Sequence, residues 1–192
     1  MIHLISSIDL SVLKYLYFLR NATAAFENIW LSELASTTTV AGLSVCIVII
    51  LAARRMYASA SGFILTVAGS AATTFILKEI IRRARPDTYY WAYYETGFSF
   101  PSGHATLSIA FWGAVVFLLW QTTSSKLVRT LLLVALVITV SLVDFSRLYL
   151  GVHYLSDVVA GTMVGGVFLF AGIRVTKRLS DQALSRSAEN SL

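Results

Sequence analysis

Residues 103–120 read GHATLSIAFWGAVVFLLW, a stretch of apolar and small residues that contains no Asp, Glu, Lys or Arg. A stretch of this length and composition is typical of an α-helix that crosses the ~30 Å hydrocarbon core of a bilayer. The whole chain has the same character, since 57% of its 192 residues are hydrophobic and 13% are charged. Soluble domains average about 25% charged residues. The composition therefore excludes a disordered chain and an ordinary soluble enzyme.

Charged residues divide the rest of the chain into further apolar intervals. From these intervals we expect five membrane-spanning helices, near residues 36–53, 60–81, 103–120, 127–144 and 155–174. The predicted fold class is thus all-α, a polytopic transmembrane helical bundle. Its transmembrane domain would cover residues 36–175, and a polar, frayed cytoplasmic tail would follow over residues 176–192.

The first 35 residues are less apolar than the predicted spans. Asp9 and Lys14 interrupt the apolar residues of segment 2–19, and two glutamates do the same in segment 21–35. This mixture predicts one or two amphipathic helices in the membrane interface over residues 1–35. The alternative is a sixth, marginal span over residues 2–19.

Basic residues predict the orientation of the bundle, and the net charge of +5 also suggests contact with anionic lipid or phosphate rather than nucleic acid. Three groups lie in connections that five alternating spans would place on one side: Arg54 and Arg55; Lys126 and Arg129; and Arg174, Lys177 and Arg178. By the positive-inside rule, this side is cytoplasmic. Segments 82–102 and 145–154 then lie on the opposite, outer side of the membrane.

Those two outer segments carry polar residues that the orientation rule does not explain. Lys78, Arg82 and Arg85 are spaced i, i+4 and i+7, which predicts that they share one face of a helix ended by Pro86. Three cations there could converge on an anion. The alternative is that their side chains extend toward lipid head groups.

A second cluster, Phe100-Pro101-Ser102-Gly103-His104, directly precedes the third predicted span. Ser102 is a favourable N-cap, and the free N–H groups of a helix N-terminus favour a bound phosphate. His104 would lie beside such an anion. The alternative is that this cluster only begins a helix.

A third cluster contains Ser146, Arg147, His153 and Asp157. The i, i+4 spacing lets the Asp157 carboxylate reach one nitrogen of the His153 imidazole and leave the other free as a nucleophile. Arg147 offers two parallel donors for phosphoryl oxygens. The alternative is a structural His–Asp pair. For Asp144, a pair with Arg147 and a position at the membrane edge both stay open.

Together the three clusters supply cations, a helix N-terminus, two histidines and an aspartate, which are the groups that phosphoryl transfer requires. The patterns are Lys78-x6-Arg85-Pro86, Pro101-Ser102-Gly103-His104 and Ser146-Arg147-x5-His153-x3-Asp157. In residue and spacing, the chain resembles the type 2 phosphatidic acid phosphatase superfamily of bacterial membrane lipid phosphatases.

The resemblance implies a role for each matching residue. His153 would be the nucleophile that forms a phosphohistidine, Asp157 would orient it, and His104 would protonate the leaving group. The implied phosphate-binding residues are Lys78, Arg85, Ser102, Gly103 and Arg147. Members of the family need no metal, so neither a metal nor another cofactor is expected.

The expected partners are membrane lipids and a lipid phosphate substrate, with phosphatidylglycerophosphate and undecaprenyl pyrophosphate as the main choices. Transfer of the phosphoryl group to another lipid and a non-enzymatic transport role stay open, as does the oligomeric state. The aromatic residues of segment 88–100 predict either an interfacial anchor or a lid over the head group.

Overall fold

The computed structural model describes residues 2–189, and within this range the chain is helical and contains no β-strand. The elements in chain order are α1 (Ile2–Leu19), α2 (Ala22–Glu33), α3 (Thr37–Ala53), α4 (Tyr57–Ile81), the 3-10 turn η1 (Thr88–Tyr90), α5 (Gly103–Leu107), the π-helical turn η2 (Ser108–Trp112), α6 (Gly113–Trp120), α7 (Lys126–Tyr149) and α8 (Leu155–Glu189). Five segments are long and apolar enough to cross a membrane: Ala22–Ala53, Tyr57–Ile81, Gly103–Trp120, Lys126–Tyr149 and Leu155–Ser185. The predicted helical bundle with five spans is confirmed.

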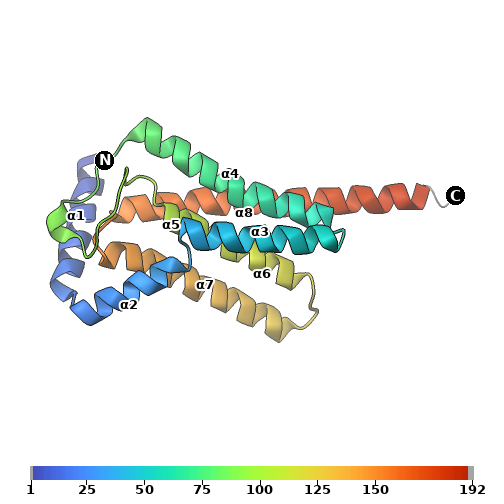
Figure 1. Cartoon of the computed structure of the whole chain (residues 1–192), viewed down its shortest axis with the longest axis horizontal. Coiled ribbons are helices and arrows are strands. Elements are labelled where there is room, and N and C mark those ends of the chain that lie inside the picture. The colour runs from blue at the N-terminus through green and yellow to red at the C-terminus, as the bar shows by residue number, and fades with distance from the viewer. Residues whose placement is uncertain (1, 190–192) are drawn as a thin grey trace.

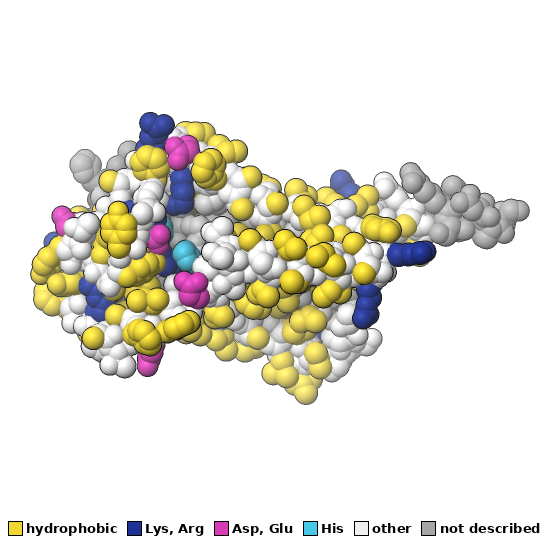
Figure 2. Space-filling model, in the orientation of Figure 1, with side chains coloured by type: hydrophobic (Ala, Val, Ile, Leu, Met, Phe, Trp, Pro, Cys, Tyr) yellow, Lys and Arg dark blue, Asp and Glu magenta, His cyan; other side chains and the backbone are white. Residues whose placement is uncertain are grey.

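The long helices run side by side along the longest axis of the molecule, and α1 crosses one end of them (Figure 1). Loop 82–102 lies at the same end as α1, whereas the α3–α4 and α6–α7 connections lie at the other (Figure 1). Hydrophobic side chains cover the flank of the bundle, while histidine, acidic and basic side chains lie together near the α1 end (Figure 2). The bundle therefore has a polar end and an apolar flank, as a membrane requires.

Small residues let α8 pack closely against its neighbours. A Cβ atom added at Gly161 would lie 2.4 Å from the carbonyl oxygen of Ser102, and one added at Gly165 would lie 2.3 Å from that of Thr106. Backbones can approach this closely only where no side chain intervenes. The two glycines therefore fix the start of α5 against α8, and the small-residue pair serves packing within the bundle.

The N-terminal region forms two helices, as predicted. Phe26 and Trp30 of α2 point outward, whereas Asn28 and Ser32 are buried, so the apolar face of this helix is the exposed one. The first candidate span includes α2 and begins before the predicted start at residue 36. Helix α1 crosses the end of the bundle (Figure 1), and it is not among the candidate spans of the described residues.

Two predicted helix ends are wrong. Helix α8 continues to Glu189 instead of fraying after residue 175, because residues 176–189 contain neither glycine nor proline and the helix can propagate. Helix α7 continues past Asp144 to Tyr149, and Ser146 and Arg147 in this last turn are completely buried. The end of the predicted tail, residues 190–192, lies outside the described residues.

Candidate functional site

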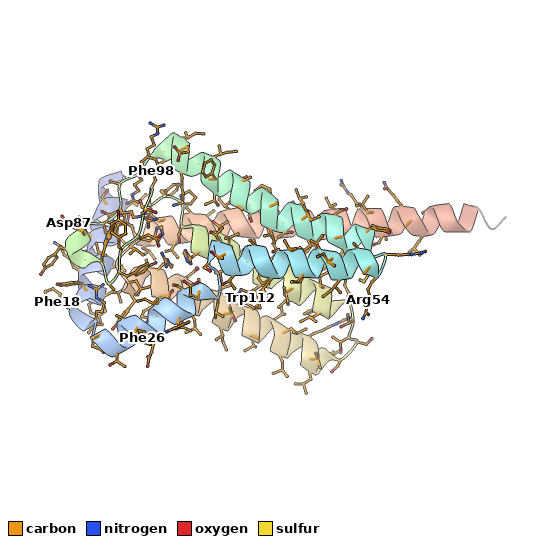
Figure 3. The ribbon with its side chains drawn as sticks, in the orientation of Figure 1. Phe18, Phe26, Arg54, Asp87, Phe98 and Trp112 are labelled. Carbon is orange, nitrogen blue, oxygen red and sulfur yellow. The ribbon has the colours of Figure 1, made fainter. Side chains whose placement is uncertain are left out.

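The three predicted clusters meet at the end of the bundle that α1 crosses. Figure 3 shows side chains from several elements gathered at this end, near Asp87 and Phe98, while Arg54 lies at the opposite end. The last turns of α4 and α7 contribute Lys78 and Arg147, and loop 82–102 contributes Arg85. The start of α5 contributes Ser102, Gly103 and His104, the α7–α8 connection contributes His153, and the first turn of α8 contributes Asp157.

The predicted helix face with Lys78, Arg82 and Arg85 is wrong. Helix α4 ends at Ile81, before Pro86, because Arg82 adopts a left-handed conformation with φ 49°. The Arg82 side chain is exposed and pairs with Glu79 at 3.9 Å. Arg85 reaches the site from the loop instead, so only two of the three cations converge there.

The His153 imidazole is buried between an arginine and an aspartate. Its Nε2 atom lies 3.2 Å from Arg85 Nη1, and its Nδ1 atom lies 3.5 Å from Asp157 Oδ2. A guanidinium can only donate, so Nε2 must be the acceptor and Nδ1 carries the proton toward Asp157. Burial, together with the nearby Arg147 and Arg85, holds the pKa of His153 well below its usual range. The imidazole is therefore neutral at pH 7, with its basic nitrogen facing the cations.

A chain of ion pairs holds Asp157 in place. Arg83 Nη1 donates to Asp157 Oδ1 at 2.6 Å, and Arg83 Nη2 donates to Asp9 Oδ2 at 2.7 Å. The backbone N–H of Tyr154 donates to the other carboxylate oxygen of Asp157 at 2.9 Å. Asp9 in turn accepts from the backbone N–H and the hydroxyl of Ser156. Helix α1 is thus joined to the residue that is predicted to orient His153.

Sequence reasoning did not assign Arg83 or Asp9 to the site. Asp9 is only 2% exposed although it lies in a helix that crosses the end of the bundle. A buried carboxylate requires a partner, so an aspartate within the apolar pattern of segment 2–19 was the available signal. Its partner, 74 positions further along the chain, had no comparable signal.

Arg147 is completely buried, and only part of its guanidinium has a partner. Its Nη2 atom donates to Glu95 Oε2 at 2.5 Å, while Nε and Nη1 are buried and have no hydrogen-bond partner. Glu95 also accepts from the Tyr93 hydroxyl at 2.8 Å and lies 4.0 Å from Arg85. Burial alone would raise the pKa of Glu95, but Arg147, Tyr93 and Arg85 hold it at about 2. Glu95 is therefore an ionised partner of Arg147 that the motifs did not indicate.

Residues 95–98, which we call the inner loop, engage all three predicted phosphate-binding cations. Lys78 donates to the carbonyl of Phe98, and Arg85 donates to those of Thr96 and Gly97 at 2.8 and 3.0 Å. The third cation, Arg147, pairs with the Glu95 carboxylate. Oxygen atoms of the inner loop thus bind the groups that are predicted to bind phosphoryl oxygens.

The start of α5 has the predicted N-cap. The Ser102 side chain accepts from the backbone N–H of Ala105 at 3.5 Å, and Ser102 is completely buried. A Cβ atom added at Gly103 would meet no atom within 4 Å, so the space in front of this backbone is open. The first N–H groups of the span can donate hydrogen bonds to an anion there.

The aromatic residues of segment 88–100 do not all point the same way, and their predicted role as anchor or lid stays a prediction. Tyr89 and Tyr94 are 67% and 80% exposed, as interfacial anchors would be, whereas Tyr93 points inward to Glu95.

Asp144 pairs with Thr162, which donates to it at 2.7 Å, and not with Arg147.

These features define an integral membrane protein with a cationic, histidine-containing site at one end of its helical bundle. Residues 59–181 match the PAP2 superfamily, so the chain belongs to this family.

Relatives agree with this assignment. The chain is 38% identical to phosphatidylglycerophosphatase B of Bacillus subtilis over 97 residues, which are 50% of this chain and 47% of that protein. It is 35% identical to undecaprenyl-diphosphatase of Sulfolobus acidocaldarius over 105 residues, 52% of this chain and 47% of that protein. The chain thus spans about half the length of the curated relatives it matches.

The fold is also that of a solved relative. The crystal structure of a transmembrane PAP2-type phosphatidylglycerolphosphate phosphatase from Bacillus subtilis superposes with a TM-score of 0.79. The match covers 90% of this chain and 86% of that one, with 22% sequence identity. The two chains therefore share the PAP2 membrane fold.

Proposed function

We propose that the protein is a membrane-embedded phosphatase that removes phosphate from a lipid phosphate or lipid pyrophosphate through a phosphohistidine intermediate. The observation that carries this proposal is the state of His153. Its imidazole is neutral, and its Nε2 atom accepts from Arg85 in the neighbourhood of the predicted phosphate-binding cations. A neutral imidazole with a fixed tautomer is a competent nucleophile.

In the first step, Nε2 of His153 attacks phosphorus and the bond from phosphorus to the leaving oxygen breaks. His104 donates a proton to that oxygen, so a lipid alcohol or lipid monophosphate leaves. Asp157 stabilises the charge on the phosphorylated imidazole through Nδ1–H, which lies 3.5 Å from its Oδ2 atom. In the second step, water attacks phosphorus, His104 accepts the proton, and the phosphorus–nitrogen bond breaks to release phosphate.

The cations stabilise the charge that develops on the phosphoryl oxygens. Arg147 brings two buried donor atoms without a partner, which gain hydrogen bonds only when an anion is bound. Lys78, Arg85, Ser102 and the backbone N–H of Gly103 complete the oxyanion site. No step in this sequence requires a metal, so activity should survive EDTA.

The named functions of the relatives suggest two substrate classes, phosphatidylglycerophosphate and undecaprenyl pyrophosphate. The proposed location is the bacterial inner membrane with the site at the periplasmic face. This orientation is supported by the basic connection at Arg54, which lies at the end of the bundle opposite the site (Figure 3).

The test is a panel of lipid phosphates and pyrophosphates assayed for phosphate release by the purified protein in detergent, without an acceptor lipid and with EDTA. We expect release by the wild type and by Glu79→Gln, a matched change at an exposed ion pair of the same end. His153→Ala should lose activity by several powers of ten. If His153→Ala keeps more than a few per cent of the turnover, the covalent mechanism is wrong. Turnover only with an acceptor lipid would indicate a phosphotransferase.

A further inference from the structure

A cavity of about 660 Å³ lies between α6, α7 and α8, toward the end of the bundle opposite the active site. Helix α7 diverges from α8 toward this end (Figure 1). The wall of the cavity is apolar and includes Leu133, Leu136, Leu169 and Ile173. Such a space in a membrane protein is open to hydrocarbon and is suited to an acyl chain.

Two cations, Arg129 of α7 and Lys177 of α8, also line this cavity. The Arg129 guanidinium lies over the Trp120 ring, 5.1 Å from its centroid, and its Nε atom is buried without a hydrogen-bond partner. Among the side chains of residues 5–185, neither cation forms an ion pair with an acidic group. On the face shown in Figure 2, Lys and Arg side chains appear at this end without an acidic neighbour. The cavity therefore has two cations that pair with no described acidic side chain, including Asp181, four positions after Lys177 on α8.

The cations and the apolar wall are arranged along the membrane normal. Lys177 and Leu169 lie eight positions apart on α8, and Arg129 and Leu136 lie seven apart on α7. At 1.5 Å per residue, the apolar wall extends about 10–12 Å from the cations toward the middle of the bundle. A free phosphate would contact only the cations, and a neutral lipid would contact only the apolar wall. A ligand that contacts both needs a negative charge and an acyl chain.

We propose that this cavity is a binding site for an anionic phospholipid, whose phosphate contacts Arg129 and Lys177 and whose acyl chain fills the space along α7 and α8. The site is separate from the active site. Asp157 and Lys177 are 20 positions apart on the same helix, about 30 Å, which is the thickness of the hydrocarbon core. The bound lipid therefore belongs to the leaflet opposite the one that the active site faces.

The test measures the binding of phosphatidylglycerol and of phosphatidylcholine with identical chains to the purified full-length protein, by native mass spectrometry and by the lipid-dependent shift in Tm. The test variant is Arg129→Gln/Lys177→Gln. Its matched control is Lys126→Gln/Arg178→Gln, which removes the same charge from the same two helices at exposed positions outside the cavity. With about 1 kcal/mol per basic residue, we expect a tenfold to thirtyfold loss of phosphatidylglycerol binding in the test variant alone.

A second variant, Leu133→Trp, narrows the apolar part of the cavity without changing charge and should weaken phosphatidylglycerol binding. Equal binding by the test variant and the wild type would overturn the proposal, and so would an equal loss in the control pair. A Tm increase by inorganic phosphate as large as that by phosphatidylglycerol would also overturn it, because the acyl chain would then contribute nothing.

Discussion

Glu95 pairs with the arginine that is predicted to bind the substrate phosphate, so Glu95→Gln tests whether the inner loop competes with the substrate. The glutamine keeps the size and one oxygen of the side chain but removes the negative charge from its contact with Arg147, 2.5 Å long in the wild type. A hydrogen bond to a charged group contributes about 1.5–3 kcal/mol. If the glutamine contact is weaker by the smaller of these values, an anion displaces the side chain from Arg147 about ten times more easily.

We therefore expect Glu95→Gln to bind vanadate about ten times more tightly than the wild type, measured by isothermal titration calorimetry in detergent. Vanadate serves as the probe because it adopts the geometry of the phosphoryl transition state. Without vanadate, the variant should have a lower Tm, since Arg147 would be a buried charge without its partner. Saturation with vanadate should restore the Tm of the wild type.

The pH dependence gives a further check. The pKa of Glu95 is held at about 2, so its carboxylate is ionised in the wild type throughout the range from pH 6 to pH 8. The affinity difference between the two proteins should therefore be the same at both pH values. Glu79→Gln, at an exposed pair, should leave vanadate binding unchanged. Equal or weaker vanadate binding by Glu95→Gln would refute the reasoning, because Glu95 would then support the pocket instead of competing for it.

Other changes test the remaining parts of the site. His104→Ala should lower turnover of a lipid phosphate by about 10²–10⁴-fold but affect an activated aryl phosphate much less, because a stable leaving group needs no general acid; equal losses in steady-state assays would contradict this role. Asp9→Asn should lower kcat by about tenfold with little change in KM, because Arg83 loses one of the two carboxylates that hold it against Asp157. An unchanged kcat would show that α1 does not contribute to the mechanism. In a Cys46→Ser background, a cysteine at Thr96 should react with an impermeant thiol reagent on intact cells, whereas one at Ser124 should not. The reverse pattern would put the site in the cytoplasm.

The spans and the motif residues could be predicted from the sequence because both depend on local patterns. Charge-free intervals give the spans, and the N-cap at Ser102 needs information only from its neighbours. The predicted helix face with Lys78, Arg82 and Arg85 is wrong because the helix ends earlier than the sequence indicates. A left-handed arginine at position 82 is uncommon, and the helix rules favour continuation up to the residue before Pro86.

The contacts of Glu95 and Asp9 could not be predicted because their partners are distant in the sequence. Arg147 lies 52 positions after Glu95, and Arg83 lies 74 positions after Asp9. A single sequence gives each carboxylate many basic residues as possible partners. Only the packing of loop 82–102 and α1 over the end of the bundle selects among them.

Because Asp9 is linked through Arg83 to Asp157, α1 belongs to the functional part of this chain together with the stretch that matches the family. The stretch that matches the family begins at residue 59 and therefore omits α1. A boundary drawn from similarity alone would keep every motif residue and discard a carboxylate that neutralises Arg83 and steadies it against Asp157. This boundary also removes α2 and α3, which form the first candidate span. A protein shortened by α1 alone would keep all five candidate spans and should still turn over slowly. Truncated or N-terminally fused versions should therefore be judged by their kcat, not by their expression.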